Sequence, residues 1–339
     1  MPQLRQSWAE RLFQLVPNNV LNGLNVHSAS GEYAKHMYSE QFAYGDREII
    51  LKYSGLPYST QLIGNLQHGT FLPDEPIDFG VPRFQWGRPA KFWVYSREVE
   101  SQARSLGLTH VHAIGAPWLY LQKATSSMPV LREGSMPKIL ILPGHSQTNY
   151  WNMNSRSEKM QRARLFRQAV GSRDATICLH AVDFCDPDIR NSFLEMNFPV
   201  TCVGSSQSVT PWTQASNRVR MLFDLMELMR THSHFITDDF GTSIFYAISM
   251  GLEIAIFPEI SAELKYQWSS ENSETTSDGH LQYFQQNLQK SINQFAPAHN
   301  YSELADSVLG RESLRSPQEL REVLDYKVGV YPDFSAEPW

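Results

Sequence analysis

The stretch that decides the fold is 231–258, which reads THSHFITDDFGTSIFYAISMGLEIAIFP. Its apolar runs predict a short buried strand at 235–236, a helix at 244–250 and a second strand at 254–257. Gly251, directly after the predicted helix, is typical of a helix C-terminus. A strand, a helix and a strand in this order predict one βαβ unit, and therefore a parallel sheet.

The loop between the first strand and the helix carries aspartate, glycine and hydroxyl side chains. A helix N-terminus offers backbone N–H groups and the positive end of the helix dipole, so it suits a phosphate. Ordinary helix caps have a similar composition, and the stretch alone leaves both interpretations open. The candidate phosphate or nucleotide ligands here are Asp238, Asp239, Gly241, Thr242 and Ser243.

The composition bounds the class of protein. The chain has 339 residues, long enough for two domains, with 42% hydrophobic and 19% charged residues. Its net charge of −6 argues against a nucleic-acid-binding surface, which needs a basic footprint. The sequence has no apolar run long enough for a transmembrane helix and no secretory signal, so we expect a cytoplasmic protein.

Two further features of the chain have alternative interpretations. Residues 1–16 predict a short amphipathic helix, which packs on its own domain or touches the inner membrane peripherally. The three cysteines (Cys178, Cys185 and Cys202) lack a CxxC spacing, so we expect thiols in a reducing compartment and no bound metal. A second copy of the chain remains a candidate partner.

Strands and helices alternate in both halves of the chain. In the first half, 92–95 and 111–114 predict strands on either side of a helix at 97–106. The polar stretch 122–136 predicts a linker, after which the alternation restarts with a strand at 138–142. We therefore expect an α/β fold with two Rossmann-like domains, 1–121 and 137–310, facing across a cleft, and a helix and tail at 311–339 packing back on the body.

Candidate site residues follow several of these strands. Because ligands of doubly wound sheets bind at the carboxyl ends of the strands, we expect them to meet in the cleft. Any single histidine among them also has an ordinary structural explanation. These residues are His68 with Gly69 and Thr70, His145 with Ser146, His180, and Ser205 with Ser206.

Four motifs carry a resemblance to a known family. The loop 66–70, the strand 139–143, the strand and histidine at 177–180, and the element 236–247 resemble, in order and rough spacing, motifs of the CDP-glycerol glycerophosphotransferases and related bacterial surface-polymer transferases. The resemblance covers residues 60–258. It implies the GT-B glycosyltransferase fold, a nucleotide-linked donor and transfer without a metal or other cofactor.

Departures from the family pattern bear on the transferred group. Gln67 replaces a tryptophan, residues 73–76 replace a basic pair, Ala181 replaces a proline, and Phe240-Gly241 replace a serine pair. These changes favour a nucleotide sugar, including CMP-linked acidic sugars of capsule enzymes, over glycerol phosphate. The acceptor would be a glycan or glycolipid of a growing surface polysaccharide. The alternatives are a CDP-glycerol-type polyol-phosphate transferase, a sugar-nucleotide epimerase and a catalytically silent binding protein.

In the mechanism that we expect from the resemblance, the domain 1–121 is on the acceptor side and the domain 137–310 binds the nucleotide-linked donor. His68 is the candidate general base, because an imidazole titrates near working pH. The helix N-terminus at 241–243 would hold the donor phosphate in place of a metal. His180, the second catalytic candidate, and His145 could donate hydrogen bonds to the phosphate or sugar. Asp238 or Asp239 is an alternative base, although a cap or a ribose contact is the expected role beside a phosphate.

Overall fold

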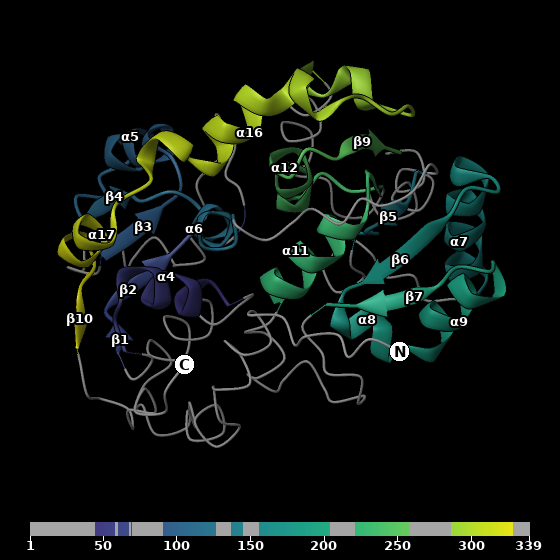
Figure 1. Ribbon diagram of the computed structural model, residues 1–339, viewed down its shortest axis with the longest axis horizontal. Helices are drawn as coiled ribbons and strands as arrows, with labels where there is room; N and C mark the ends of the chain where they lie inside the picture. Colours follow the sequence, from purple (N-terminus) through teal and green to yellow (C-terminus); the bar gives the residue numbers. More distant parts are fainter. Residues whose placement is uncertain are drawn as a thin grey trace.

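The computed structural model describes residues 45–57, 60–67, 69, 91–126, 137–144, 156–203, 221–257 and 286–327. Two parallel sheets lie side by side with helices against them (Figure 1). The larger has five strands and the smaller has three. The predicted α/β class, with parallel sheets and helices, is confirmed.

The larger sheet has the strand order of a doubly wound fold. All of its neighbouring strands are parallel, and the order is β7-β6-β5-β8-β9. The direction of progression along the chain reverses between β5 and β8, which makes this the topological switch point. Its strands are β5 (Ile139–Ile141), β6 (Ala175–Leu179), β7 (Val200–Cys202), β8 (His234–Thr237) and β9 (Glu253–Ile256).

The helices of the larger sheet follow the apolar periods of the sequence. The opening stretch forms β8, α12 and β9, as its pattern predicts. Its helix begins after Gly241 and is followed by Gly251 in the left-handed conformation. The helices are α7 (Arg156–Val170), α8 (Ala181–Cys185), α9 (Pro187–Glu195), α11 (Met221–Thr231) and α12 (Thr242–Ser249).

The smaller sheet is built from β2 (Gly64–Leu66), β3 (Lys91–Val94) and β4 (Val111–Ala113) in that order. Between β3 and β4 runs α5 (Arg97–Ser105), whose first turn is capped by Ser96 accepting from the Val99 N–H at 3.3 Å. Two further helices, α4 (Asp46–Ser54) and α6 (Pro117–Ala124), pack against each other. The predicted strand–helix–strand rhythm of 92–114 is confirmed.

One strand of the smaller sheet lies where the sequence predicted a loop. In the sequence, the apolar pair 62–63 predicts a short strand that leads into a loop at 64–70, but in the structure β2 begins at Gly64. A Cβ at Gly64 would lie 2.6 Å from both the Lys91 carbonyl oxygen and the Trp93 ring. The glycine is therefore required because Trp93 packs against the strand, and such a contact is invisible in a single stretch of sequence.

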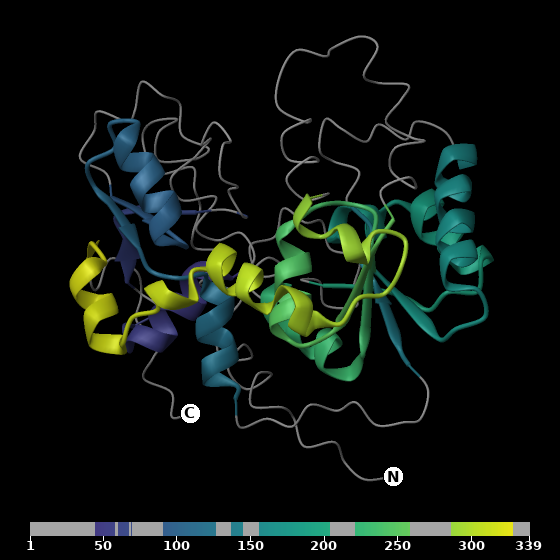
Figure 2. The ribbon, with the colours of Figure 1, turned by 90° about the horizontal axis from the view of Figure 1, so that it is seen from above.

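The C-terminal part of the chain returns from the larger sheet to the smaller one. The helix α16 (Ser302–Leu309) packs on α12, and α17 (Pro317–Val323) packs on α4 (Figure 2). The strand β10 (Tyr326–Lys327) then pairs antiparallel with β1 (Gln61–Leu62). In the sequence, Ser316, Pro317 and Glu319 predict a capped helix start, and the capping box between Ser316 and Glu319 confirms it. The sequence also predicts a helix over 281–292; of its described residues, 286–287 are helical, and the 3-10 turn Gln289–Ser291 takes the place of its end.

Apolar packing joins the two sheets. One cluster of buried side chains includes Trp93 and Tyr95 from the smaller sheet together with Leu140 and Phe235 from the larger. At its centre the Trp118 ring of α6 stacks on Tyr246 of α12, with ring centroids 4.3 Å apart and planes inclined by 16°. The relative position of the sheets is thus fixed by burial of aromatic surface.

The expected domain boundaries stay predictions. Helix α6 extends to Ala124, so it runs into the stretch 122–136 that was expected to be a linker. Residues 127–136 lie outside the described part of the chain, as does the amphipathic segment 1–16.

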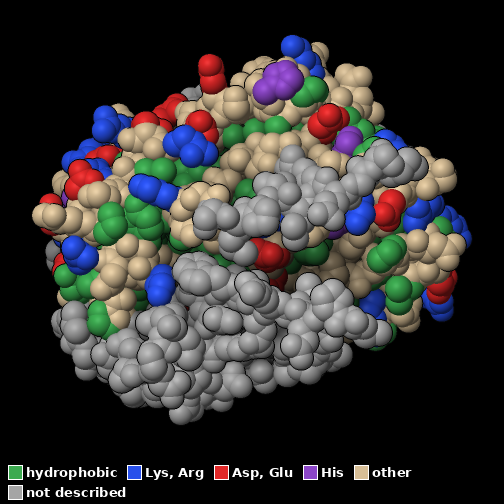
Figure 3. All heavy atoms as spheres, in the orientation of Figure 1, with side chains coloured by type: hydrophobic (Ala, Val, Ile, Leu, Met, Phe, Trp, Pro, Cys, Tyr) green, Lys and Arg blue, Asp and Glu red, His purple; other side chains and the backbone are tan. Residues whose placement is uncertain are grey.

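The described surface carries both signs of charge. On the face shown in Figure 3, acidic and basic side chains are interspersed and do not gather into one field. Within the described ranges, no helix is both long and apolar enough to cross a membrane.

Candidate functional site

The candidate site lies at the carboxyl ends of β5 and β8, where the strand order reverses. The chain leaves β5 toward Gly144 and leaves β8 through Asp238 and Asp239 into the N-terminus of α12. In open α/β sheets this is the position at which ligands bind. The loop 237–243 therefore lies at this edge of the larger sheet, and its role in binding a phosphate stays a prediction.

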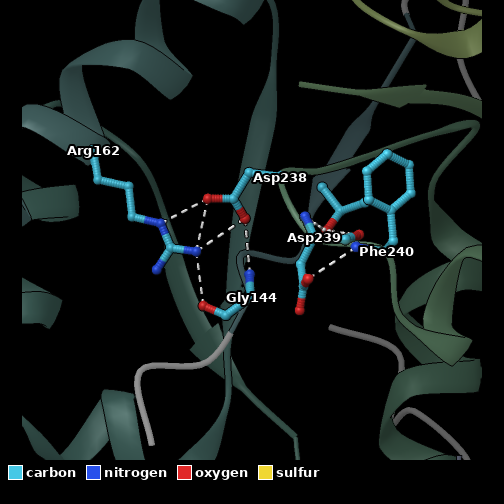
Figure 4. Close-up of polar contacts among 6 residues, drawn as sticks. Gly144, Arg162, Asp238, Asp239 and Phe240 are labelled. Carbon is cyan, nitrogen blue, oxygen red and sulfur yellow. Dashed lines mark hydrogen bonds and ion pairs between the residues drawn. The ribbon is translucent and has the colours of Figure 1, made fainter. Parts of the chain in front are cut away.

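A buried ion pair holds the two strand ends together (Figure 4). Arg162 of α7 donates from Nε to Asp238 Oδ2 at 2.8 Å and from Nη2 to Asp238 Oδ1 at 2.9 Å. The Gly144 N–H donates to Asp238 Oδ1 at 2.9 Å, and Arg162 Nη2 also donates to the Gly144 carbonyl at 2.7 Å. Asp238 thus bridges α7, the end of β5 and the end of β8.

The burial of this pair decides its role. Asp238 is fully buried and Arg162 is 2% exposed. Burial raises the pKa of Asp238, while the Arg162 charge and the Gly144 N–H act in the opposite direction. A fully buried carboxylate with these partners holds the loop in place and is not exposed to a ligand. The side chain of the neighbouring Asp239 points away from the ion pair (Figure 4).

Asp239 is partly exposed and packs against Gly144. A Cβ at Gly144 would lie 2.7 Å from the Asp239 Cβ and 3.0 Å from its Oδ2, so only glycine fits beside this side chain. Asp239 Oδ1 accepts from the Phe240 N–H at 2.9 Å, and its own N–H donates to Thr237 Oγ1 at 3.1 Å. The turn into α12 is therefore fixed by local hydrogen bonds.

The start of α12 has the geometry of an anion-binding helix terminus. Gly241 is the N-cap in extended backbone conformation, and no side-chain hydrogen bond caps the helix there. Thr242 and Ser243 are partly exposed in the first turn, whereas the residues after them are buried in the core. Backbone N–H groups at such an end favour a negative charge.

The turn at Gly69 on the smaller sheet reaches this helix terminus. A Cβ at Gly69 would lie 3.5 Å from Thr242 Oγ1, so the two residues are neighbours in space. Gly69 has φ +76°, a backbone conformation that glycine adopts without steric cost. Gly69, which follows the smaller sheet, and Thr242, which follows β8 of the larger sheet, are therefore close to each other.

Other sequence-predicted residues are placed only in part. His180 directly follows β6, the strand beside β5, and is partly exposed at the same edge of the sheet; its carbonyl accepts from the Phe184 N–H at 2.9 Å. The remaining predicted residues lie outside the described part of the chain, namely His68, Thr70, His145, Ser146, Ser205 and Ser206.

Two residues of the site were missed at the level of sequence. Arg162 stands one turn before the buried Phe166 on α7, and a charged side chain on an apolar face is a signal for a buried partner. Gln67 was interpreted only as a replacement of tryptophan. Its side chain is 3% exposed and bridges the end of β3 to Gly69, a contact that no sequence pattern indicates.

Among the described residues, no group of three or more histidine, cysteine, aspartate or glutamate side chains is arranged to hold a metal ion. The metal-free site inferred from the sequence remains a prediction.

No protein-family model matches the chain, and no curated protein does. Among solved structures, one of S. aureus MnaA with UDP is similar at a TM-score of 0.37 and 11% sequence identity, over 94% of this chain and 76% of that chain. A similarity at this level places the chain in no family.

Proposed function

We propose that this protein is a glycosyltransferase that binds a nucleotide-linked sugar at the N-terminus of α12 and transfers the sugar to a glycan or glycolipid acceptor. The observation that carries the proposal is the proximity of Gly69 to Thr242, whose Oγ1 would lie 3.5 Å from a Cβ at Gly69. It sets a turn of the smaller sheet against a helix terminus at the switch point of the larger sheet. Transfer of a sugar requires that the donor and the acceptor be bound next to each other, and residues from both sheets are close together here.

The donor phosphate is assigned to the first turn of α12. As the sugar leaves, negative charge grows on the nucleotide phosphate, and the helix terminus stabilises that charge through N–H groups and its dipole. Asp239, partly exposed beside Gly144, suits a hydroxyl donor such as a ribose. His180, at the end of the neighbouring strand β6, is assigned to the phosphate or the sugar.

The acceptor is assigned to the side of the smaller sheet. His68 stands between Gln67 and Gly69 in the chain and is proposed as the general base. It would take the proton of the acceptor hydroxyl while that oxygen bonds to the sugar carbon. The bond from this carbon to the phosphate oxygen breaks, and the nucleotide leaves with the bonding electrons.

Substitution of Ser243 tests the donor site. Ser243→Asp puts a carboxylate in the first turn of α12, where it favours the helix by about 0.3–1 kcal/mol and repels a phosphate. We expect stability to be kept or raised and the thermal shift produced by CMP, CDP, UDP or GDP to be lost. Ser243→Asn, which is neutral, should keep the shift. A full nucleotide shift in Ser243→Asp would overturn the assignment.

Turnover then distinguishes the chemistry. The purified chain is incubated with nucleotide sugars, including a CMP-linked acidic sugar, with and without a glycan acceptor. Release of nucleotide that depends on the acceptor supports transfer, whereas conversion of the donor alone indicates an epimerase. If no nucleotide stabilises the unmodified chain, the proposal fails, because a ligand present well above its Kd stabilises by mass action.

A further inference from the structure

Gln67 joins the end of β3 to the turn at Gly69 within the smaller sheet through a single buried amide. Its Oε1 accepts from the Tyr95 N–H just beyond β3 at 2.8 Å, and its Nε2 donates to the Gly69 carbonyl at 2.8 Å. The backbone N–H of Gln67 donates to the Trp93 carbonyl at 2.8 Å. The residue is thus fixed to β3 at two points and holds the turn at a third.

The chemistry of these bonds requires an amide. One end of the group must accept from an N–H and the other must donate to a carbonyl, and a planar amide supplies both at once. A carboxylate would set an acceptor against the Gly69 carbonyl, and alanine would leave the Tyr95 N–H buried without this partner. Because Gln67 is 3% exposed, water is a poor substitute at either end.

The turn that Gln67 holds is the one that lies against α12. Gly69 is the residue next to Thr242, and its carbonyl is the group bound by Gln67. A change at Gln67 therefore moves the turn relative to the helix terminus without altering a group of α12 itself.

We infer that Gln67 is a positioning residue, which holds the turn at Gly69 against the N-terminus of α12 and so sets the distance between acceptor-side groups and the donor phosphate. The inference rests on the proposed function, and it concerns alignment rather than binding of the donor. The donor should bind equally well without Gln67, whereas transfer should be slow. A misplacement of about 1 Å costs reaction rate on the order of 100-fold.

The experiment compares Gln67→Ala and Gln67→Glu with Gln318→Ala, an exposed glutamine on α17. Thermal shift by the nucleotide panel reports donor binding, and nucleotide release from the corresponding nucleotide sugar gives kcat and KM. We expect kcat of Gln67→Ala to fall about 10- to 100-fold with the donor KM within about threefold. Faster hydrogen exchange of the Tyr95 amide should accompany the fall, and Gln318→Ala should match the unmodified chain.

Gln67→Glu supplies a readout that a general loss of stability does not produce. Ionised, it repels the Gly69 carbonyl; protonated, its hydroxyl donates to that carbonyl while its other oxygen accepts from Tyr95 N–H. Its kcat relative to the unmodified chain should therefore recover as the pH falls, and Gln67→Ala should show no recovery. This rescue also keeps the test decisive if Gln67→Ala fails to fold.

The outcomes separate the two proposals. The positioning role is overturned if kcat is unchanged in both Gln67 variants, or if kcat of Gln67→Glu does not recover at low pH. In either case, a nucleotide-induced thermal shift in the unmodified chain still supports the proposed function. Loss of the nucleotide shift together with kcat also overturns it, since Gln67 would then act on binding. If no nucleotide produces a thermal shift in the unmodified chain, both proposals fail. The missing shift then shows that it is the proposed function that is wrong, and not only the role of Gln67.

Discussion

Arg162 and Asp238 form a two-point ion pair directly beneath the switch point of the larger sheet, with Nε–Oδ2 and Nη2–Oδ1 distances of 2.8 and 2.9 Å. Neither side chain is more than 2% exposed. The pair also holds both the N–H and the carbonyl of Gly144, so it fixes the end of β5 relative to the end of β8. The shape of the candidate phosphate loop therefore depends on a residue of α7 far away in the sequence.

Breaking this pair should destabilise the fold strongly. Arg162→Met leaves the Asp238 carboxylate buried without this cation, and Asp238→Asn removes the anion that faces the buried guanidinium, each at a cost of about 3–5 kcal/mol. The double variant Arg162→Met/Asp238→Leu should recover much of the loss, because apolar replacements of both partners remove both buried charges. Urea unfolding measures these costs.

The matched control for Arg162→Met is Arg164→Met, at an exposed position two residues further along α7. Its free energy of unfolding should stay within about 0.5 kcal/mol of the unmodified chain. Costs below about 1 kcal/mol for both single variants would mean that the pair does not hold the loop as the geometry indicates.

Asp46 should make stability fall as the pH rises. It is 2% exposed in the first turn of α4, and its Oδ1 has no hydrogen-bond partner in the part of the chain that the structure describes. Burial, aided by the nearby Glu48 charge, raises its pKa well above the ordinary value. Below the unfolded-state pKa both states are protonated; above it the unfolded state ionises first, so stability is lost until the pH passes the folded-state pKa.

Asp46→Asn removes this loss. Its stability advantage over the unmodified chain should be small near pH 4 and grow towards pH 8, as measured by urea unfolding at both values. Asp188→Asn, at an exposed position in the first turn of α9, is the control and should show no such growth. An advantage that is constant with pH would show that Asp46 does not titrate differently in the folded chain.

How much could be predicted from sequence differs between the two sheets. The opening stretch was predicted well because a buried strand, a glycine-bearing loop and an apolar helix each leave a local pattern. The capping box at Ser316 is equally local. In contrast, β2 contains Gly64 and Asn65, which are poor strand formers, and it exists because β3 offers a parallel partner.

The site shows the same division between local and tertiary information. The helix terminus of α12 and the glycine turn at Gly69 were each visible in the sequence, but their proximity depends on how α6 stacks on α12. Gln67 was missed because hydrogen bonds to the end of another strand leave no periodic signal. The position of Arg162 on the apolar face of α7 indicates a buried partner, but it does not say that the partner is Asp238. Positions that support a site are harder to predict than the loops they support.

The N-cap of α9 offers a test of a partly exposed ion pair. Asp186 Oδ1 accepts from the N–H groups of Asp188 and Ile189 at 2.8 and 3.2 Å, and Oδ2 accepts from Lys159 Nζ at 2.8 Å. Asp186→Ala should lose about 0.5–2 kcal/mol of stability through the missing cap. Asp186→Asn keeps the cap and loses only the ion pair, so its cost should be below about 1 kcal/mol.

The pH dependence of Asp186 is opposite to that of Asp46. Partial burial by itself raises the pKa of Asp186, but hydrogen bonds from Lys159 and from the backbone of α9 outweigh it and lower the pKa. Its stabilisation is therefore present above the unfolded-state pKa and is lost as the pH falls through the folded-state pKa. The gap between the unmodified chain and Asp186→Asn should begin to shrink at about pH 4 and should vanish once the pH is below the lower folded-state pKa. A gap that is the same at strongly acidic and at neutral pH would contradict the lowered pKa.

Gly64 gives the last prediction, because it reports the packing of Trp93 against β2. In Gly64→Ala the added Cβ meets the Lys91 carbonyl and the Trp93 ring at 2.6 Å, and β2 must shift to relieve both contacts. The cost of such overpacking is typically about 1–3 kcal/mol, and the backbone contact places this variant at the upper end. Gly241→Ala is the comparison, since its Cβ would meet nothing closer than Ser243 Oγ at 4.0 Å and its φ is −113°, so it loses only the N-cap preference for glycine, about 1 kcal/mol or less. Gly64→Ala should therefore lower the melting temperature more than Gly241→Ala does, and equal melting temperatures would show that Trp93 does not pack tightly against β2.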